Sequence, residues 1–216
     1  EEAEVRVLDT DPDPALPDGV EYVHGDVRDR RTVDAAAAGV DVIFHQAALV
    51  SVEASIDRPV ESHGVNATGT LEVLEAARRN DARVVVASSA AVYGNPEGVP
   101  VAETDPLVPT SPYGVDKLAV DHYARLYNEL YDLETVALRY FNVYGPGQAG
   151  SEYAAVIDVF VRQARAGEPI TVEGDGQQTR DFVHVDDVVR ANRLAATTDA
   201  VGAAYNVGTG ESVTIE

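Results

Sequence analysis

A tyrosine and a lysine lie four residues apart, as Tyr113 and Lys117, in the segment SPYGVDK at residues 111–117. Residues at this spacing share one face of a helix, so the lysine ammonium can lie beside the phenol. A free tyrosine has a pKa near about 10 and is a poor base, but a fixed cation favours the phenolate and lowers that pKa. The pair could therefore remove a proton from a substrate hydroxyl. The alternative is a core aromatic beside a solvated surface charge.

The lysine content of the chain favours the chemical interpretation. Lys117 is the only lysine in 216 residues, and the other 15 of the 16 basic side chains are arginines. A second candidate is Ser89, which follows the apolar run 84–87, where open α/β sheets place their ligands. Ser88 is its competitor. Neither serine lies in a G-x-S-x-G turn, so an acyl-transfer nucleophile is not expected.

These side chains need a scaffold, and the hydrophobic pattern predicts an α/β one. Short apolar strands that alternate with helices are typical of a parallel sheet covered on both faces. Ser111 is a good N-cap and Pro112 a good first helical residue. In the helix that they open, Leu118, His122, Leu126 and Leu130 mark one stripe. We expect strands at 5–8, 22–24, 42–45, 84–87, 135–138, 170–172 and 204–207, and helices at 30–38, 59–79, 111–131, 153–165 and 186–197.

The first elements of a dinucleotide-binding sheet are not found in the sequence. Such a sheet normally opens with a strand, a glycine-rich turn and a helix that holds the pyrophosphate. No G-x-G-x-x-G or G-x-x-G-x-x-G follows a strand here, and the chain begins at what resembles a second strand. We therefore expect an internal fragment, without a first β-α unit of roughly 30 residues and truncated at its C-terminus. Such a fragment is expected to be inactive by itself.

The composition excludes several classes of function. The net charge is −21, from 37 acidic and 16 basic residues, so nucleic acid and anionic membranes should be repelled. Cysteine is absent and the five histidines have no close ligand spacing, so no metal site is expected. The chain has no long apolar span and no signal-like start, which indicates a cytoplasmic protein. Acidic excess without lysine resembles halophilic proteins, but a GC-rich genome would also favour arginine.

Eight motifs in order make the chain similar to the extended short-chain dehydrogenase/reductase family, and within it to NAD-dependent nucleotide-sugar epimerases and dehydratases. The resemblance covers essentially all 216 residues. It implies a Rossmann-like doubly wound parallel sheet lacking its first β-α unit, with part of a small C-terminal substrate-binding lobe. The motifs are LD at 8–9, GDV at 25–27, HQAA at 45–48, NATGT at 66–70, SSAAVYG at 88–94, Y-x-x-x-K at 113–117, RYFN at 139–142 and RDFVHV at 180–185.

The resemblance also implies a domain division and a mechanism. Residues 1–145 would be the NAD-binding domain, 146–180 the start of the substrate-binding lobe, and 181–216 a return helix and strand of the NAD-binding domain. Tyr113 and Lys117 would be catalytic and would contact the nicotinamide end of NAD. Ser89 would bind the sugar O4 and the tyrosine. Family members commonly dimerise through helices corresponding to 59–79 and 111–131, so a homodimer is expected.

Asp9 is the expected contact for the adenosine ribose. It ends a strand, where an acidic side chain can accept hydrogen bonds from the ribose hydroxyls. Asp11 follows without a basic neighbour and would repel a 2′-phosphate, which favours NAD over NADP. The alternative for Asp9 is a plain surface turn.

Four further residues match the family's cofactor contacts. Asp26 and Val27 correspond to a polar partner and an apolar wall for the adenine. Ala47 and Ala48 are small enough for the cofactor to come close, although the same alanines could serve helix–strand packing. Together with Asp9, these residues outline an NAD site.

The substrate contacts implied by the resemblance are Ser51, Asn142 and Arg180. Arg180 would bind the diphosphate with its bidentate guanidinium, unless it forms an ion pair with Asp181. Val50 stands where many galactose-type epimerases have lysine, and Ser51 is expected to compensate. The identity of the sugar is not defined by these residues.

The residues after Ser89 bear on the reaction. Related sugar 4,6-dehydratases carry an acid pair or a glutamate there to expel water, whereas this chain has Ala90 and Ala91. This favours a 4-epimerase that oxidises and re-reduces sugar C4, with UDP-glucose and UDP-galactose as the default pair. The alternatives are a 4,6-dehydratase or related sugar-nucleotide enzyme, and a non-catalytic dinucleotide sensor.

Overall fold

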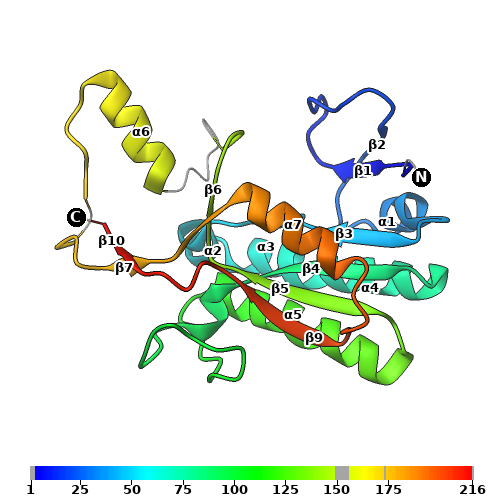
Figure 1. Cartoon of the computed structure of the whole chain (residues 1–216). Helices are drawn as coiled ribbons and strands as arrows, with labels where there is room; N and C mark the ends of the chain where they lie inside the picture. The colour runs from blue at the N-terminus through cyan, green and yellow to red at the C-terminus, as the bar shows by residue number, and fades with distance from the viewer. Residues whose placement is uncertain (1–2, 149–155, 173, 216) are drawn as a thin grey trace.

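The computed structural model describes residues 3–148, 156–172 and 174–215 (Figure 1). Its centre is a four-stranded parallel sheet, which confirms the predicted α/β class. The strand β4 lies between β3 and β5, and β9 continues the sheet beyond β5. The four strands are β3 (Val42–His45), β4 (Arg83–Ser89), β5 (Thr135–Tyr140) and β9 (Ala203–Val207).

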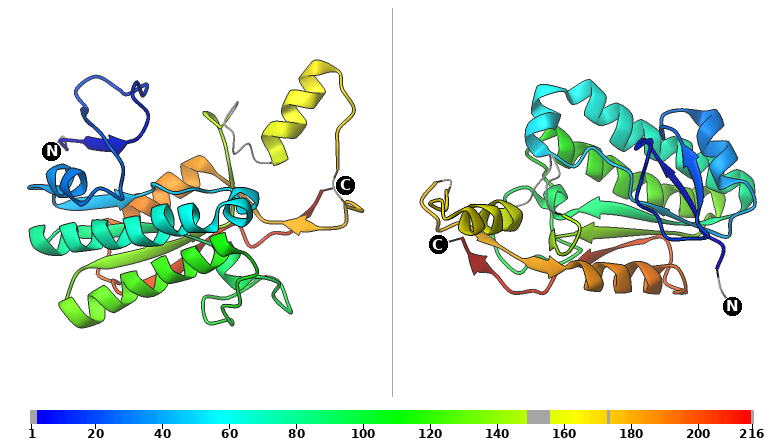
Figure 2. Two further views of the ribbon diagram at one scale, coloured as in Figure 1. Left: turned by 180° about the vertical axis from the view of Figure 1, so that it is seen from behind. Right: turned by 90° about the horizontal axis from the view of Figure 1, so that it is seen from above.

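Helices cover both faces of this sheet (Figure 2). The helices α1 (Arg30–Ala37), α4 (Gly69–Asn80) and α5 (Pro112–Tyr131) pack on one face, and α7 (Val185–Ala195) packs on the other. Alternation along β4 divides the core, because Val84 and Val86 face α4 and α5 whereas Val85 faces α7. All three of these valines are fully buried. The sheet is therefore doubly covered, as the sequence predicts.

Three smaller strand pairs flank the central sheet. β1 (Arg6–Asp9) pairs in parallel with β2 (Glu21–His24), and this pair forms its own two-stranded sheet. β6 (Asn142–Tyr144) pairs in parallel with β8 (Phe182–His184), and β7 (Thr179–Arg180) pairs antiparallel with β10 (Val213–Thr214). The helix α6 (Val156–Ala166) lies away from the sheet, beyond the ends of the strands (Figure 1).

The paired strand predicted at 170–172 is not formed, and one predicted boundary of α6 cannot be compared with the structure. The prediction of a strand at 170–172 is wrong, because Thr171 binds a side chain of α6 and not a neighbouring strand. Its backbone N–H donates to Gln163 Oε1, and its hydroxyl accepts from Gln163 Nε2, both at 3.0 Å. The predicted start of α6 at residue 153 lies outside the described residues.

The helix that carries Tyr113 and Lys117 begins as predicted. Ser111 is the N-cap, its Oγ accepts the Gly114 N–H at 3.0 Å, and Pro112 is the first helical residue. The stripe of Leu118, His122, Leu126 and Leu130 runs along a largely exposed side of this helix, where Leu126 and Leu130 are 43% and 63% exposed. The buried face of α5 lies elsewhere and includes three charged residues, Asp116, Lys117 and Asp121. The other buried residues of this helix are Gly114, Val120, Ala124 and Tyr127.

The helix predicted at 59–79 is interrupted by a wider turn. It consists of α3 (Pro59–His63), a π-helical turn η1 (Gly64–Thr68) and α4, and a short α2 (Val52–Asp57) precedes it. The wide turn holds the buried Asn66, whose side chain bonds both backbone groups of Leu49. Asn66 Oδ1 accepts the Leu49 N–H at 2.8 Å, and Nδ2 donates to the Leu49 carbonyl at 3.0 Å. No helix in the described parts of the chain is long and apolar enough to cross a membrane.

Candidate active site

Three side chains meet where β4 ends and α5 begins. The Ser89 hydroxyl, at the last residue of β4, lies close enough to the phenol of Tyr113, in the first turn of α5, to influence its pKa. One turn later, the Lys117 ammonium lies 5.9 Å from the centre of the Tyr113 ring. The ammonium donates a hydrogen bond of 2.7 Å to the Ala87 carbonyl oxygen. The structure thus brings together the serine, tyrosine and lysine that the sequence singles out.

Burial controls the ionisation of Tyr113 and Lys117. Lys117 is 4% exposed, and burial lowers its pKa to about 8 against a smaller, opposite effect of Asp116. Burial raises the pKa of Tyr113, and the nearby Ser89 hydroxyl acts against this rise. The expected lowering of the Tyr113 pKa by Lys117 is therefore wrong for this structure. The physical reason is that desolvation of the phenol dominates, while the ammonium is bonded to Ala87.

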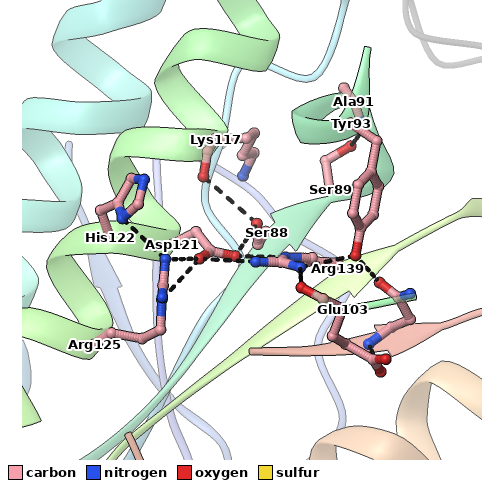
Figure 3. Close-up of polar contacts among 11 residues, drawn as sticks. Ser88, Ser89, Ala91, Tyr93, Glu103, Lys117, Asp121, His122, Arg125 and Arg139 are labelled. Atoms are coloured by element: carbon pink, nitrogen blue, oxygen red, sulfur yellow. Dashed lines mark hydrogen bonds and ion pairs between the residues drawn. The ribbon is translucent and has the colours of Figure 1, made fainter. Parts of the chain in front are cut away.

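Ser88, the competitor of Ser89, faces a different environment. Its hydroxyl lies 3.5 Å from the Lys117 carbonyl oxygen and 3.4 Å from Asp121 Oδ2, in the interior of the protein (Figure 3). Ser89, in contrast, caps the short 3₁₀ turn η2 (Ala90–Tyr93) by accepting the Ala91 N–H at 3.1 Å. The interior position of Ser88 leaves Ser89 as the serine that acts on the pKa of Tyr113.

A second group of polar side chains supports the trio from α2 and α3. Ser55 Oγ accepts the Tyr113 N–H at 3.1 Å, which holds the start of α5. The carboxylate of the buried Asp116 accepts from Ser62 Oγ at 2.6 Å and lies 2.9 Å from His63 Nδ1. Sequence analysis did not identify these contacts, although Asp116 directly precedes Lys117.

The residues expected to bind adenosine lie around β1 and β2. The exposed Asp9 ends β1, and its Oδ1 accepts the Asp11 N–H at 3.0 Å, which orients the carboxylate. Asp26 is held by Arg28, whose hydrogen bond lowers the pKa of the carboxyl. Val27 is 8% exposed and packs in the core, so little of its side chain is open to a ligand.

The residues present fit part of a dinucleotide. Ala47 is exposed and Ala48 half-buried directly after β3, so a ligand can come close to that edge of the sheet. Asp9 supplies the acceptor that a ribose diol requires. The described residues include no glycine-rich turn between a strand and a helix, which is the element that holds a pyrophosphate. The described residues that fit NAD are therefore those expected at its adenosine end and its nicotinamide end, and not at its pyrophosphate.

The expected substrate residues lie on three separate elements. Ser51 caps α2 by accepting the Ala54 N–H at 3.0 Å. Asn142 Nδ2 donates to the Asp181 carbonyl at 2.9 Å and so ties β6 to the segment before β8. The exposed Arg180 donates to the Thr179 carbonyl at 2.8 Å.

The alternative role of Arg180, an ion pair with Asp181, is not formed in the described structure. The Asp181 carboxylate instead accepts the N–H groups of Thr209 and Gly210 and the Thr209 hydroxyl, at 2.8–3.0 Å. The guanidinium of Arg180 therefore remains on the surface with donors directed to solvent or a ligand.

Two polar networks near the trio were not predicted. One centres on Arg139, which is 2% exposed and binds Asp121 on α5 (Figure 3). The other joins Tyr140, Gln46 and Asn192 at the ends of β5 and β3 and on α7, with contacts of 2.8–3.3 Å. Arg139 and Tyr140 stand inside the RYFN motif, and an arginine in an otherwise apolar strand is the signal that could have identified the first network.

Comparison with known proteins agrees with the geometry. Residues 1–208 match the NAD dependent epimerase/dehydratase family. The chain is 40% identical over 198 residues to a putative UDP-glucose 4-epimerase of Methanocaldococcus jannaschii, covering 90% of this chain and 64% of the relative. It is also 40% identical over 201 residues to the UDP-glucose 4-epimerase of Mycolicibacterium smegmatis, covering 89% and 63%. The chain therefore spans less than two thirds of the length of these curated relatives.

A solved structure gives the same result. The UDP-glucose 4-epimerase of Thermus thermophilus, in complex with NAD, superposes with a TM-score of 0.89 at 39% identity, over 98% of this chain and 72% of that one. Together with the match over residues 1–208, this similarity identifies the chain as a member of the NAD dependent epimerase/dehydratase family.

Proposed function

We propose that the chain carries the catalytic residues of an NAD-dependent nucleotide-sugar 4-epimerase, with UDP-glucose and UDP-galactose as the default pair. The observation that carries the proposal is the meeting of Ser89, Tyr113 and the buried Lys117 where β4 ends and α5 begins. The similarity to two proteins named UDP-glucose 4-epimerases supports it.

The proposed chemistry divides between cofactor and protein. The chemistry that NAD supplies when bound is reversible acceptance of a hydride, here from sugar C4. Tyr113 takes the proton of the C4 hydroxyl and later returns it, and Ser89 holds that oxygen by a hydrogen bond. Lys117 keeps a positive charge next to the phenol and hydrogen-bonds the nicotinamide ribose. Ala90 and Ala91 cannot transfer protons, which argues against elimination at C6.

The substrate would lie between the sheet edge and the segments that follow it. We propose residues 1–145 and 181–216 as the cofactor-binding domain and 146–180 as the start of the substrate-binding lobe. The position of α6, away from the central sheet, supports this division (Figure 2). Asn142 and Ser51 would contact the sugar nucleotide, and the exposed Arg180 its diphosphate.

A homodimer through α3 and α5 is part of the proposal. Apolar side chains on these helices face outward, with exposed fractions of 85% for Val60, 52% for Val115 and 63% for Leu130. These exposed side chains lie on the helices through which a dimer is expected, and they support the assignment. Light scattering in molar salt measures the mass of the particle, and a monomer would contradict this assignment.

Cofactor preference tests the role of Asp9. In the complete protein, Asp9→Ala combined with Thr10→Arg should admit NADP, because the ribose acceptor is removed and a cation for the 2′-phosphate is introduced. Binding of both cofactors is measured by calorimetry. Asp18→Ala, which removes an exposed acid of the same loop, is the control and should still prefer NAD. An unchanged preference in the double variant would contradict the ribose assignment.

The proposed function is tested directly with the protein expressed from its complete reading frame. Incubation with UDP-galactose in molar KCl should give an isobaric product that elutes as UDP-glucose, detected by chromatography and mass spectrometry. A product lighter by one water would indicate a 4,6-dehydratase. No conversion by protein with bound NAD would contradict this sugar pair, and failure on other sugar nucleotides as well would favour a dinucleotide sensor.

We also propose that the protein is cytoplasmic and adapted to the KCl that salt-accumulating cells hold there, and the same assay tests the adaptation to salt. At a net charge of −21, dilution of salt leaves the mutual repulsion of acidic residues unscreened, so structure and activity should both be lost at low salt. Full activity at about 10 mM salt, where the screening length reaches about 30 Å, would contradict this adaptation.

A further inference from the structure

One buried guanidinium, that of Arg139 on β5, joins three segments of the candidate active site. On one side it forms a two-point contact with Asp121 of α5, from Nε to Oδ2 at 2.7 Å and from Nη2 to Oδ1 at 3.2 Å. Arg139 is 2% exposed and the Asp121 side chain is fully buried. Asp121 lies one helical turn after Lys117, so this contact fixes the helix that carries the lysine (Figure 3).

The other side of the guanidinium holds the turn that begins at Ser89. Arg139 Nη1 donates to the Tyr93 hydroxyl at 2.8 Å, and that hydroxyl donates to Asn206 Oδ1 on β9 at 2.7 Å. Tyr93 is the last residue of η2, and Ser89 caps the same four-residue turn by accepting the Ala91 N–H. The anchored Tyr93 side chain therefore restrains the segment on which the Ser89 hydroxyl is mounted.

The third segment is the connection from η2 to α5. Arg139 Nη1 also donates to the Glu103 carbonyl at 3.0 Å, and the Glu103 carboxylate accepts the Asn206 N–H at 2.9 Å. This connection leads to Ser111, the N-cap of the helix that positions Tyr113. All three partners of Arg139 thus belong to segments that carry Ser89, Tyr113 or Lys117.

Stability alone is a poor explanation for such an arrangement. Desolvation of two buried charges costs several kcal/mol each, and apolar residues of similar volume often stabilise as well or better. A guanidinium offers five donors in a fixed plane, so it can set the relative position of three segments in a way that an apolar side chain cannot. The geometry therefore favours a role in positioning.

We propose that Arg139, through Tyr93 and Asp121, is a positioning residue that keeps the Ser89 hydroxyl next to the phenol of Tyr113. The kinetic part of this inference rests on the proposed epimerase function. The hydrogen bonds of the Arg139 side chain in the described structure go to Asp121, Tyr93 and Glu103, and not to the three catalytic candidates. It acts on them through the turn η2, the connection after it and the helix α5.

The test is Tyr93→Phe in the NAD-bound protein expressed from its complete reading frame. The substitution removes one hydroxyl and leaves the Arg139 contacts with Asp121 and Glu103 in place. We expect kcat with UDP-galactose to fall by between about 10-fold and 100-fold, since misplacing reacting groups by about 1 Å can cost about 10²-fold. KM and NAD content should stay within about twofold, because the substituted residue contacts neither ligand in this proposal.

The pH profile distinguishes positioning from loss of folded protein. Tyr113 faces Lys117 on its own helix and Ser89 from the end of β4, and the nearby Ser89 hydroxyl acts against the rise in pKa that burial causes. If the Ser89 hydroxyl moves away, the pKa of Tyr113 rises further, and the acid limb of kcat should move to higher pH. A lower kcat with an unmoved limb would overturn the proposal, because partial unfolding scales activity without changing its pH dependence.

Tyr205→Phe is the matched control. It removes a tyrosine hydroxyl from β9, next to Asn206, but among the described residues that hydroxyl donates only to the Ala200 carbonyl, at 3.0 Å. Its kcat and pH profile should equal those of the wild type. Wild-type behaviour of Tyr93→Phe as well would overturn the proposal.

Crystal structures of the wild type and Tyr93→Phe separate this inference from the proposed function. We expect the distance from Ser89 Oγ to Tyr113 Oη to be longer in the variant than in the wild type by about 1 Å, a displacement that can cost about 10²-fold in rate. An unchanged distance overturns the positioning role even if the enzyme is an epimerase. A lengthened distance in a protein that does not convert UDP-galactose supports the positioning role while contradicting the proposed substrate.

Discussion

Tyr113→Phe is expected to abolish nearly all turnover while leaving the fold and NAD binding intact. The substitution removes only the hydroxyl that would carry the C4 proton, and proton transfer by a positioned side chain contributes about 10²- to 10⁴-fold in rate. The ring and the backbone contact from Tyr113 N–H to Ser55 Oγ are kept, so α5 should begin as before. Steady-state kcat with UDP-galactose is the measurement, with NAD content and circular dichroism recorded on the same samples.

Tyr205→Phe again controls for the general effect of losing a phenol hydroxyl and should keep full kcat. Near-normal turnover by Tyr113→Phe would remove Tyr113 from the proton-transfer role. A variant that also loses NAD would instead show that the phenol is needed for cofactor binding, as the family resemblance implies for Tyr113 and Lys117.

The second large effect is on stability. Asp121→Ala should reduce the free energy of unfolding by about 3–5 kcal/mol, because it leaves the Arg139 guanidinium buried without its carboxylate. Urea titration at fixed molar KCl, followed by circular dichroism, measures this loss. Asp121→Asn keeps an acceptor oxygen for Arg139 and should lose less, which secures a measurement if the alanine variant does not fold.

The control for this prediction is a surface ion pair. Arg190 and Asp187 lie 2.9 Å apart on α7 with side chains 75% and 48% exposed. Asp187→Ala should change the free energy of unfolding by less than about 1 kcal/mol, because exposed pairs are screened by water and salt. Equal losses for Asp121→Ala and Asp187→Ala would show that burial of the Arg139 pair does not determine its contribution.

The sequence predicted the sheet well because its strands are short, continuous and apolar. The runs at 42–45, 84–87 and 135–138 all lie within strands that the structure places side by side. The face of α5 could not be assigned in the same way. Its buried side includes Asp116, Lys117 and Asp121, so a rule that places apolar residues inside selects the exposed Leu126 and Leu130 instead.

The candidate site was predictable only in part. The spacing of Tyr113 and Lys117 follows from one helix, and Ser89 from the end of one strand. The partners of Arg139 come from α5, η2 and the connection to α5, at sequence separations of 18, 46 and 36 residues. Such contacts depend on how the segments pack. The wide turn that holds Asn66 likewise has no signature in the pattern of apolar residues.

Because the chain has a single lysine, a reagent directed at lysine amines reports on one position. Amine-directed acylation or reductive methylation has one side chain to modify within residues 1–216, and that side chain is 4% exposed with a pKa of about 8. At pH 8 about half of such amines are unprotonated and nucleophilic, so access, not protonation, limits the reaction. The mass of one peptide around Lys117 therefore records how often the interior of the site opens to solvent, without a spectroscopic label or an engineered cysteine.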